Sequence, residues 1–241
     1  MSKLDLPFEI IKPFYTRHLL LGESLLGDVS LVILRLAFFL KREEAFTAYH
    51  ARQLNYTSVE IDEACMVLLC RLEDRGVNGI VLYMMAQCSE SLGAKVEANN
   101  YYSKAEHVFT TEERYLSSEE LFYRGLLCQR EKPGHAPLYT EAAMYFQQAA
   151  SLGFIEAYVC LAAAFQRGEG VEKDSDLALT YYEKGVTANS LRAMLHLASL
   201  CHYTFGRYRN INRAKELYLK AADMGSVYAQ QRYLSLDGKD T

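Results

Sequence analysis

The stretch AYVCLAAAFQRGEGVEKDSDLALTYYEKGVTAN, residues 157–189, decides the fold of this 241-residue chain. Apolar and small residues recur in it at helical spacing on both sides of a Gly-x-Gly element, Gly168-Glu169-Gly170. One alanine of the stretch, Ala178, has counterparts 36 residues earlier, at Ala142, and 36 residues later, at Ala214. A period of this length is typical of stacked helical hairpins.

Six more positions repeat in step with this alanine. They form the columns Tyr145, Tyr181 and Leu217; Phe146, Tyr182 and Tyr218; Ala149, Gly185 and Ala221; Ala150, Val186 and Ala222; Gly153, Asn189 and Gly225; and Ala157, Ala193 and Ala229. Small side chains let one helix lie close against the next, and the aromatic pairs fill the space between hairpins. Because Gly153, Asn189 and Gly225 tolerate a left-handed backbone, we predict that a helix ends at each of them.

These residues resemble the Sel1-like repeats, relatives of the tetratricopeptide repeats. The copy from Ala157 to Asn189 looks like the family pattern A-x3-L-x3-[FY]-x2-G-x-G-V-x2-D-x3-A-x2-[WY]-[YF]-x-[KR]. The next copy departs at its turn, Thr204-Phe205-Gly206-Arg207, and an earlier copy has a longer connection over residues 132–137. The resemblance covers about residues 119–236 and is weak over about 78–110. It implies an all-α fold, a right-handed α/α superhelical solenoid of antiparallel helical hairpins.

We predict an N-terminal helical region over residues 1–77, made of degenerate repeats or a cap. Residues 78–241 are predicted to form the repeat solenoid with a C-terminal cap, and the two parts to form one continuous domain. The apolar segment 19–40 is interrupted by Glu23, Asp28 and Arg35, so we predict buried helices there and no membrane span. Asp5 and Glu9 stand where a secretory signal would be basic or apolar. We therefore expect a cytoplasmic protein, with export by a dedicated, signal-independent apparatus as the alternative.

The sequence predicts neither a catalytic nor a cofactor or metal site. It has no P-loop, nucleophile elbow or His-Glu-x2-His motif, and Gly168-Glu169-Gly170 is better explained as a turn between helices. The six cysteines form no matched pairs within the repeats, which indicates free thiols, and Cys65-x4-Cys70 lacks further ligands for zinc. His196 and His202 lie six residues apart, on nearly opposite sides of a helix. They are therefore poor candidates for a shared site.

A basic segment with aromatic neighbours follows Tyr203, in the order Phe205, Arg207, Tyr208, Arg209, Arg213 and Lys215. Such a combination can stack bases and hold phosphates. The chain as a whole carries a formal net charge of −4, with a pI near 5.9, which opposes binding of a polyanion. We favour a solvated turn or a contact with an acidic protein over nucleic-acid binding.

The resemblance implies a non-catalytic adaptor that binds another protein or a peptide segment, in a role such as bacterial chaperone, regulator or immunity-type protein. The concave face of such a solenoid would be lined by the first helix of each hairpin. The candidate contact residues are Tyr123, Tyr158, Gln166, Arg192, His196 and Tyr203 on these helices, and Phe205 and Arg207 at the divergent turn. Two alternatives stay open. One is an enzyme with a site in the N-terminal region, and the other is a self-assembling structural protein, which the polar tail from Asp237 to Thr241 would oppose.

Overall fold

The computed structural model describes residues 79–111, 116–132, 135–204 and 206–237, together with residues 66 and 69. The chain divides into two compact units, residues 1–113 and residues 114–241, and each is described by itself. Most of the predicted N-terminal region, including the apolar segment 19–40, lies outside the described residues. The predicted boundary at residue 77 also lies outside them and stays a prediction.

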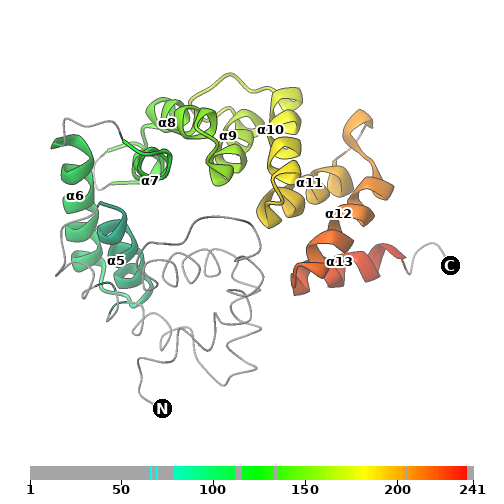
Figure 1. The fold of residues 1–241 in the computed structure, drawn as a ribbon, viewed down its shortest axis with the longest axis horizontal. Helices are drawn as coiled ribbons and strands as arrows, with labels where there is room; N and C mark the ends of the chain where they lie inside the picture. The colour runs from blue at the N-terminus through cyan, green and yellow to red at the C-terminus, as the bar shows by residue number, and fades with distance from the viewer. Residues whose placement is uncertain are drawn as a thin grey trace, which may run out of the picture. The chain divides into compact units, whose positions relative to one another are not determined.

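In the first unit, the described residues form one helical hairpin of α5, Gly79–Ser91, and α6, Lys95–Thr111 (Figure 1). Tyr102 of α6 joins the two helices, because its hydroxyl donates to Glu90 (2.9 Å) and accepts from Gln87 (2.7 Å). Its buried ring lies edge-on to that of Tyr83, with centroids 5.5 Å apart. The degenerate second helix predicted around Tyr101 and Tyr102 corresponds to α6.

The second unit is a series of helices of similar length. They are α7 Ser118–Gln129, α8 Tyr139–Ser151, α9 Ile155–Arg167, α10 Ser175–Thr187, α11 Leu191–Tyr203, α12 Ile211–Asp223 and α13 Val227–Asp237, with a short 3₁₀ turn, η2, at Gly206–Tyr208. We call α7, α9 and α11 the first helices and α8, α10 and α12 the second helices, because they pair into three consecutive hairpins. No strand occurs among the residues described, so the predicted all-α architecture of stacked hairpins is confirmed.

Side chains accept hydrogen bonds from exposed backbone N–H groups at the start of α7, α10, α11 and α12, whereas α8 and α9 have no such cap. Ser117 and Glu120 form a reciprocal capping box at the start of α7. The Asp174 carboxylate accepts from two N–H groups in the first turn of α10, each at 2.9 Å. Ser190 and Asn210 each accept from one N–H group, in α11 and α12. Such caps stabilise a helix by about 1 kcal/mol each.

The helices end where the repeat pattern predicts. Gly153, Asn189 and Gly225 have positive φ values of 84°, 58° and 98°, which confirms their prediction as helix stops. After each of them a backbone N–H returns to a carbonyl of the last helical turn, as from Ser190 to Gly185 at 2.9 Å. This left-handed cap turns the chain sharply from each second helix into the next first helix.

The core of the repeats is built from the repeating small and aromatic columns. Ala142, Ala178 and Ala214 are each fully buried, so neighbouring backbones approach closely at these points. Phe146, Tyr182 and Tyr218 are at most 1% exposed and fill the space inside the three hairpins. The column of aromatics therefore sets the spacing of the paired helices.

The hairpin turns keep one backbone hydrogen bond although their sequences differ. It runs from Asp174 N–H to Phe165 C=O at 3.0 Å in the Gly-x-Gly turn, and from Asn210 N–H to Cys201 C=O at 2.9 Å in the divergent turn. The longer connection after α7 has an equivalent bond, from Leu138 to Cys128, at 2.8 Å. The hairpin at residues 204–209 thus survives its altered sequence, as predicted.

Candidate functional site

Five side chains from three helices meet on the first-helix side of the second unit, and we call them the Tyr182 cluster. They are Gln166 and Arg167 at the end of α9, Tyr182 of α10, and Arg192 and His196 of α11. The buried Tyr182 ring stacks on the His196 imidazole, with centroids 5.6 Å apart and ring planes at 14°. Its hydroxyl donates to the Gln166 side-chain oxygen at 3.0 Å. The repeat therefore brings together polar groups that are 30 residues apart in sequence.

The cluster is accessible to solvent, because Gln166, Arg167 and His196 are exposed. Arg192 is mostly covered and reaches across to Glu156 of the preceding first helix, with one N···O contact of 3.4 Å. Arg167 is paired with Glu169 of the adjoining turn at 2.6 Å. Each arginine thus has one carboxylate neighbour, and both guanidinium groups keep further N–H donors.

The two arginines of the cluster act on the protonation of two neighbouring groups. Partial loss of solvent, followed by the charges of Arg192 and Arg167, lowers the pKa of His196 from 6.5 to about 4, so the imidazole is neutral at pH 7. Burial raises the pKa of Tyr182 to about 12, and the same two arginines oppose that rise. Arg167 and Arg192 therefore act on one small region of the surface.

A second polar group lies between α11 and α13. The Arg232 guanidinium sits 5.0 Å from the ring centroid of Tyr228 and 6.0 Å from that of Tyr203. Tyr203 is 51% exposed and stacks on His202, with centroids 4.0 Å apart. Exposed tyrosine and arginine side chains in contact are typical of protein-binding surfaces.

The structure places the predicted contact residues in different environments. Gln166, Arg192 and His196 meet in the Tyr182 cluster, and Tyr203 lies beside it along α11. Tyr123 is only 1% exposed, because its ring is packed into the core against Phe122, and we remove it from the candidate surface as a correction.

The remaining predicted residues lie away from the cluster. Tyr158 is half-buried, stacks on Tyr181 and lines a hollow beside α10. Arg207 is exposed but bonded to the preceding repeat, and Phe205 lies outside the described residues. Only some of the predicted contact residues, namely Gln166, Arg192, His196 and Tyr203, therefore lie together on one part of the surface.

The basic segment after α11 is engaged by acidic side chains of the preceding repeat. Arg207 and Tyr208 both bond to the Asp176 carboxylate, at 2.7 Å and 3.1 Å. Arg213 contacts Glu183 of α10 at 3.0 Å. These pairs neutralise much of the positive charge that the sequence concentrates here, which weakens the case for a phosphate-binding surface.

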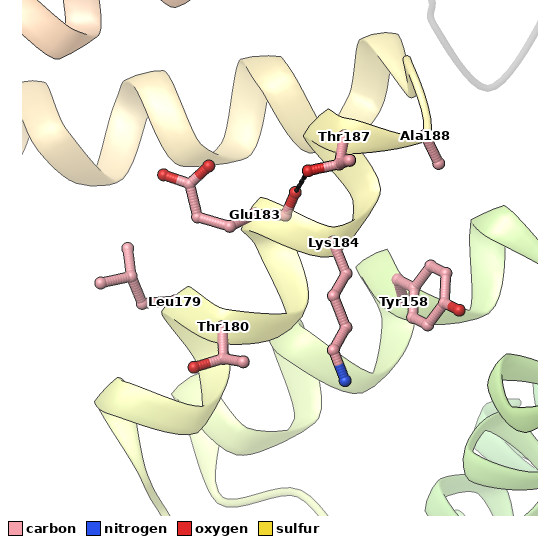
Figure 2. A pocket seen from close by; sticks show the side chains of 7 residues that line it. All are labelled: Tyr158, Leu179, Thr180, Glu183, Lys184, Thr187 and Ala188. Carbon is pink, nitrogen blue, oxygen red and sulfur yellow. Dashed lines mark hydrogen bonds between the residues drawn. The ribbon is translucent and has the colours of Figure 1, made fainter.

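An open hollow of about 740 Å³ lies beside α10 and is also lined by Tyr158 of the first helix α9 (Figure 2). Its lining residues are Tyr158, Leu179, Thr180, Glu183, Lys184, Thr187 and Ala188. The Lys184 ammonium lies 4.9 Å from the ring centroid of Tyr181, and Glu183 is the residue already paired with Arg213. The charged groups of the hollow therefore already have partners within the fold.

Sequence reasoning missed the central residue of the cluster. Tyr182 belongs to the core column of Phe146 and Tyr218, and its hydroxyl distinguishes it from Phe146. A phenol in a buried column needs a hydrogen-bond partner, and this requirement is the signal that could have identified Gln166 as its neighbour. The contribution of Arg167 depends on the close approach of α9 and α11, which the repeat pattern does not specify.

The described residues were also compared with the expectations for metal sites, cysteines and membrane-spanning helices. Within them, no group of three or more His, Cys, Asp or Glu side chains is placed to hold a metal ion. Cys88, Cys128, Cys160 and Cys201 are free thiols, as predicted for these four. No helix in this part of the chain is both long enough and apolar enough to cross a membrane.

Comparison with known proteins identifies the repeats. The family model of the Sel1 repeat matches residues 121–154, 155–190 and 191–226. An uncharacterized protein of Neisseria meningitidis serogroup B is 29% identical over 114 residues, which cover 42% of this chain and 24% of that protein. The chain thus matches about a quarter of the length of that relative.

Solved structures with the same architecture include a Sel1 repeat protein from Oxalobacter formigenes. It superposes with a TM-score of 0.50 at 19% identity, over 86% of this chain and 87% of that one. A protective antigen present in uropathogenic Escherichia coli strains, which displays an SLR fold, has a TM-score of 0.40 at 17% identity, over 99% of this chain and 64% of its own. The family model of the Sel1 repeat therefore matches residues 121–226 as three consecutive repeats, and the described helices have the solenoid fold of Sel1 repeat proteins.

Proposed function

We propose that this chain is a non-catalytic adaptor that binds another protein through the first-helix side of its Sel1 repeats. Proteins built from this repeat are generally scaffolds for protein interactions. The observation that carries the proposal is the Tyr182 cluster together with the neighbouring Tyr203 and Arg232. These side chains place exposed arginine, tyrosine and histidine groups along one side of α9, α11 and α13.

The composition of this side supports recognition of a protein. The cations of the first helices and α13 are all arginine, whereas the lysines of the repeats lie on second helices and in turns. Arginine and tyrosine contribute large contact areas and directional hydrogen bonds, and they dominate the energetics of many protein interfaces. The enzyme alternative lies in the N-terminal region, outside the described residues, and no described side chain supports it.

The proposal is tested by comparing two matched double variants of the full chain as bait in the cells that produce it. Arg167→Ala/Tyr203→Ala removes one exposed cation and one exposed apolar ring from the first-helix side. Lys220→Ala/Leu219→Ala removes an exposed cation and an exposed apolar side chain from α12. Arg167 and Lys220 each lie in the last turn of their helix, so the two changes are equivalent for helix stability.

We expect a partner that is enriched by the wild-type chain and by the α12 variant to be lost with the first-helix variant. Thermal unfolding of both variants checks that each remains folded. If the partner is lost with the α12 variant and kept with the first-helix variant, the binding surface lies on the second helices and the proposal is wrong.

A further inference from the structure

We propose that the Tyr182 cluster binds a side-chain carboxylate of an acidic peptide segment in the partner protein. This inference rests on the proposed function and adds the chemistry of the ligand. It follows from two properties of the cluster, which are its excess of hydrogen-bond donors and the loose pairing of Arg192.

The donors of the cluster outnumber its acceptors. The Gln166 side-chain oxygen already accepts from Tyr182, so the amide group of Gln166 has N–H donors to offer. Arg167 and Arg192 each use one nitrogen toward a carboxylate. Gln166 and His196 are exposed, so their remaining N–H groups face solvent, where a ligand can reach them. A ligand that supplies only acceptors, such as a carboxylate, would satisfy these donors.

The existing partner of Arg192 can be replaced. Its single contact with Glu156, at 3.4 Å, is longer than the 2.7–2.9 Å that is usual for a charge-assisted hydrogen bond. By contrast, Arg213 contacts Glu183 at 3.0 Å and Glu216 at 3.2 Å. A planar carboxylate arriving from solvent could meet Arg192 with two parallel N–H···O bonds, which the Glu156 geometry does not provide.

The charge that this ligand requires comes from Arg167 and Arg192, although the chain as a whole has a formal net charge of −4. Each of these arginines faces one glutamate, Glu169 or Glu156, so a ligand carboxylate would compete with these contacts over a small area. Such an area suits one or two carboxylates, whereas an extended nucleic-acid backbone would meet the neighbouring acidic groups.

The experiment uses peptides selected by display of a random library on the full chain. For each selected sequence, one form carries its acidic residues, and the matched neutral form has Asn and Gln in place of Asp and Glu. Both forms have an amidated C-terminus, so that they differ only in side-chain carboxylates. The affinities of both forms are measured for the wild-type chain and for Arg192→Gln, Arg213→Gln, Tyr203→Ala and Lys184→Ala. Arg213→Gln is a matched control, because Arg213 forms the equivalent inter-repeat ion pair on the second helices.

We expect the acidic form to bind the wild-type chain and Arg213→Gln equally, and to bind Arg192→Gln at least about tenfold more weakly. Such a factor lies within the usual range for removing one partner of a charge-assisted hydrogen bond. The neutral form should bind weakly to these three proteins, so that its affinity no longer depends on Arg192. This loss of dependence shows that Arg192 and the carboxylate contact each other.

The other outcomes separate the two proposals. If both peptide forms bind equally well and their binding depends on Tyr203 but not on Arg192, the carboxylate proposal is overturned and the first-helix surface stands. If binding depends on Arg213 or on Lys184 instead, or if no peptide binds with a dissociation constant below about 100 μM, both proposals fail. Far-UV circular dichroism of each variant establishes that it is folded.

Discussion

A glycine is required at position 170 because the preceding hairpin lies against it. A Cβ atom at this position would lie 2.0 Å from the Tyr139 carbonyl oxygen and 2.5 Å from the Thr140 nitrogen, at the start of α8 in the preceding repeat. Its φ of 74° also lies in the left-handed region. The second glycine of the Gly-x-Gly turn is therefore needed for turn geometry and for contact between repeats.

We predict that Gly170→Ala lowers the free energy of unfolding by about 2–5 kcal/mol, because left-handed strain adds to a clash with backbone atoms. Gly153→Ala is the matched control, since Gly153 has a φ of 84° but no heavy atom within 4 Å of an added Cβ. The control should lose only about 1–2 kcal/mol. Urea denaturation followed by circular dichroism measures both values, and equal losses would show that the contact with α8 is unimportant.

At the scale of the elements, the pairing of α7 with α8 depends on a glycine opposite an aromatic ring. Gly125 occupies the position that is Leu161 in the next repeat and Leu197 in the one after it. A Cβ at Gly125 would lie 2.6 Å from Cε1 of Phe146, whose side chain is fully buried. The absence of a side chain at Gly125 of α7 thus makes room for the Phe146 ring of α8 inside the hairpin.

We predict that Gly125→Ala destabilises the protein by up to about 2 kcal/mol, although alanine favours an isolated helix by about 1 kcal/mol over glycine. The reason is that Phe146 has no room to move away from an added methyl group. In a Phe146→Leu background the same change should become neutral or stabilising. Chemical denaturation of the four proteins in this double-mutant cycle provides the test, and a Gly125→Ala protein more stable than wild type would refute the packing argument.

On the scale of the whole molecule, the second unit is a linear array in which each hairpin packs mainly on its neighbours. Stability in such arrays is close to a sum of repeat and interface contributions. On α13, exposed Gln230 and Gln231 stand 36 residues after the apolar Met194 and Leu195, but the same helix also exposes Leu234. The C-terminal cap and the alternative of end-to-end self-assembly therefore both stay predictions.

We predict that damage to one repeat spreads only to its neighbours. Tyr218→Ala removes a fully buried ring and should cost about 3–5 kcal/mol. Hydrogen exchange measured by mass spectrometry should then accelerate in α11, α12 and α13, while α7 and α8 keep most of their protection. Tyr218→Phe, which keeps the buried ring and loses the hydroxyl with its contact to Ser199, is the conservative control. A uniform loss of protection from α7 to α13 would mean that the unit unfolds as one cooperative block.

The sequence by itself determined the helical hairpins, their stops and their period. These features depend on local chemistry, such as the left-handed conformation at Asn189 and the side-chain cap at Asp174. The tertiary structure alone decided which side chains meet. The Tyr182 cluster draws on α9, α10 and α11, and burial removed Tyr123 from the candidate surface. The physical reason is that contacts between helices depend on the distance and rotation between neighbouring hairpins, and a repeating pattern of residue types does not specify these.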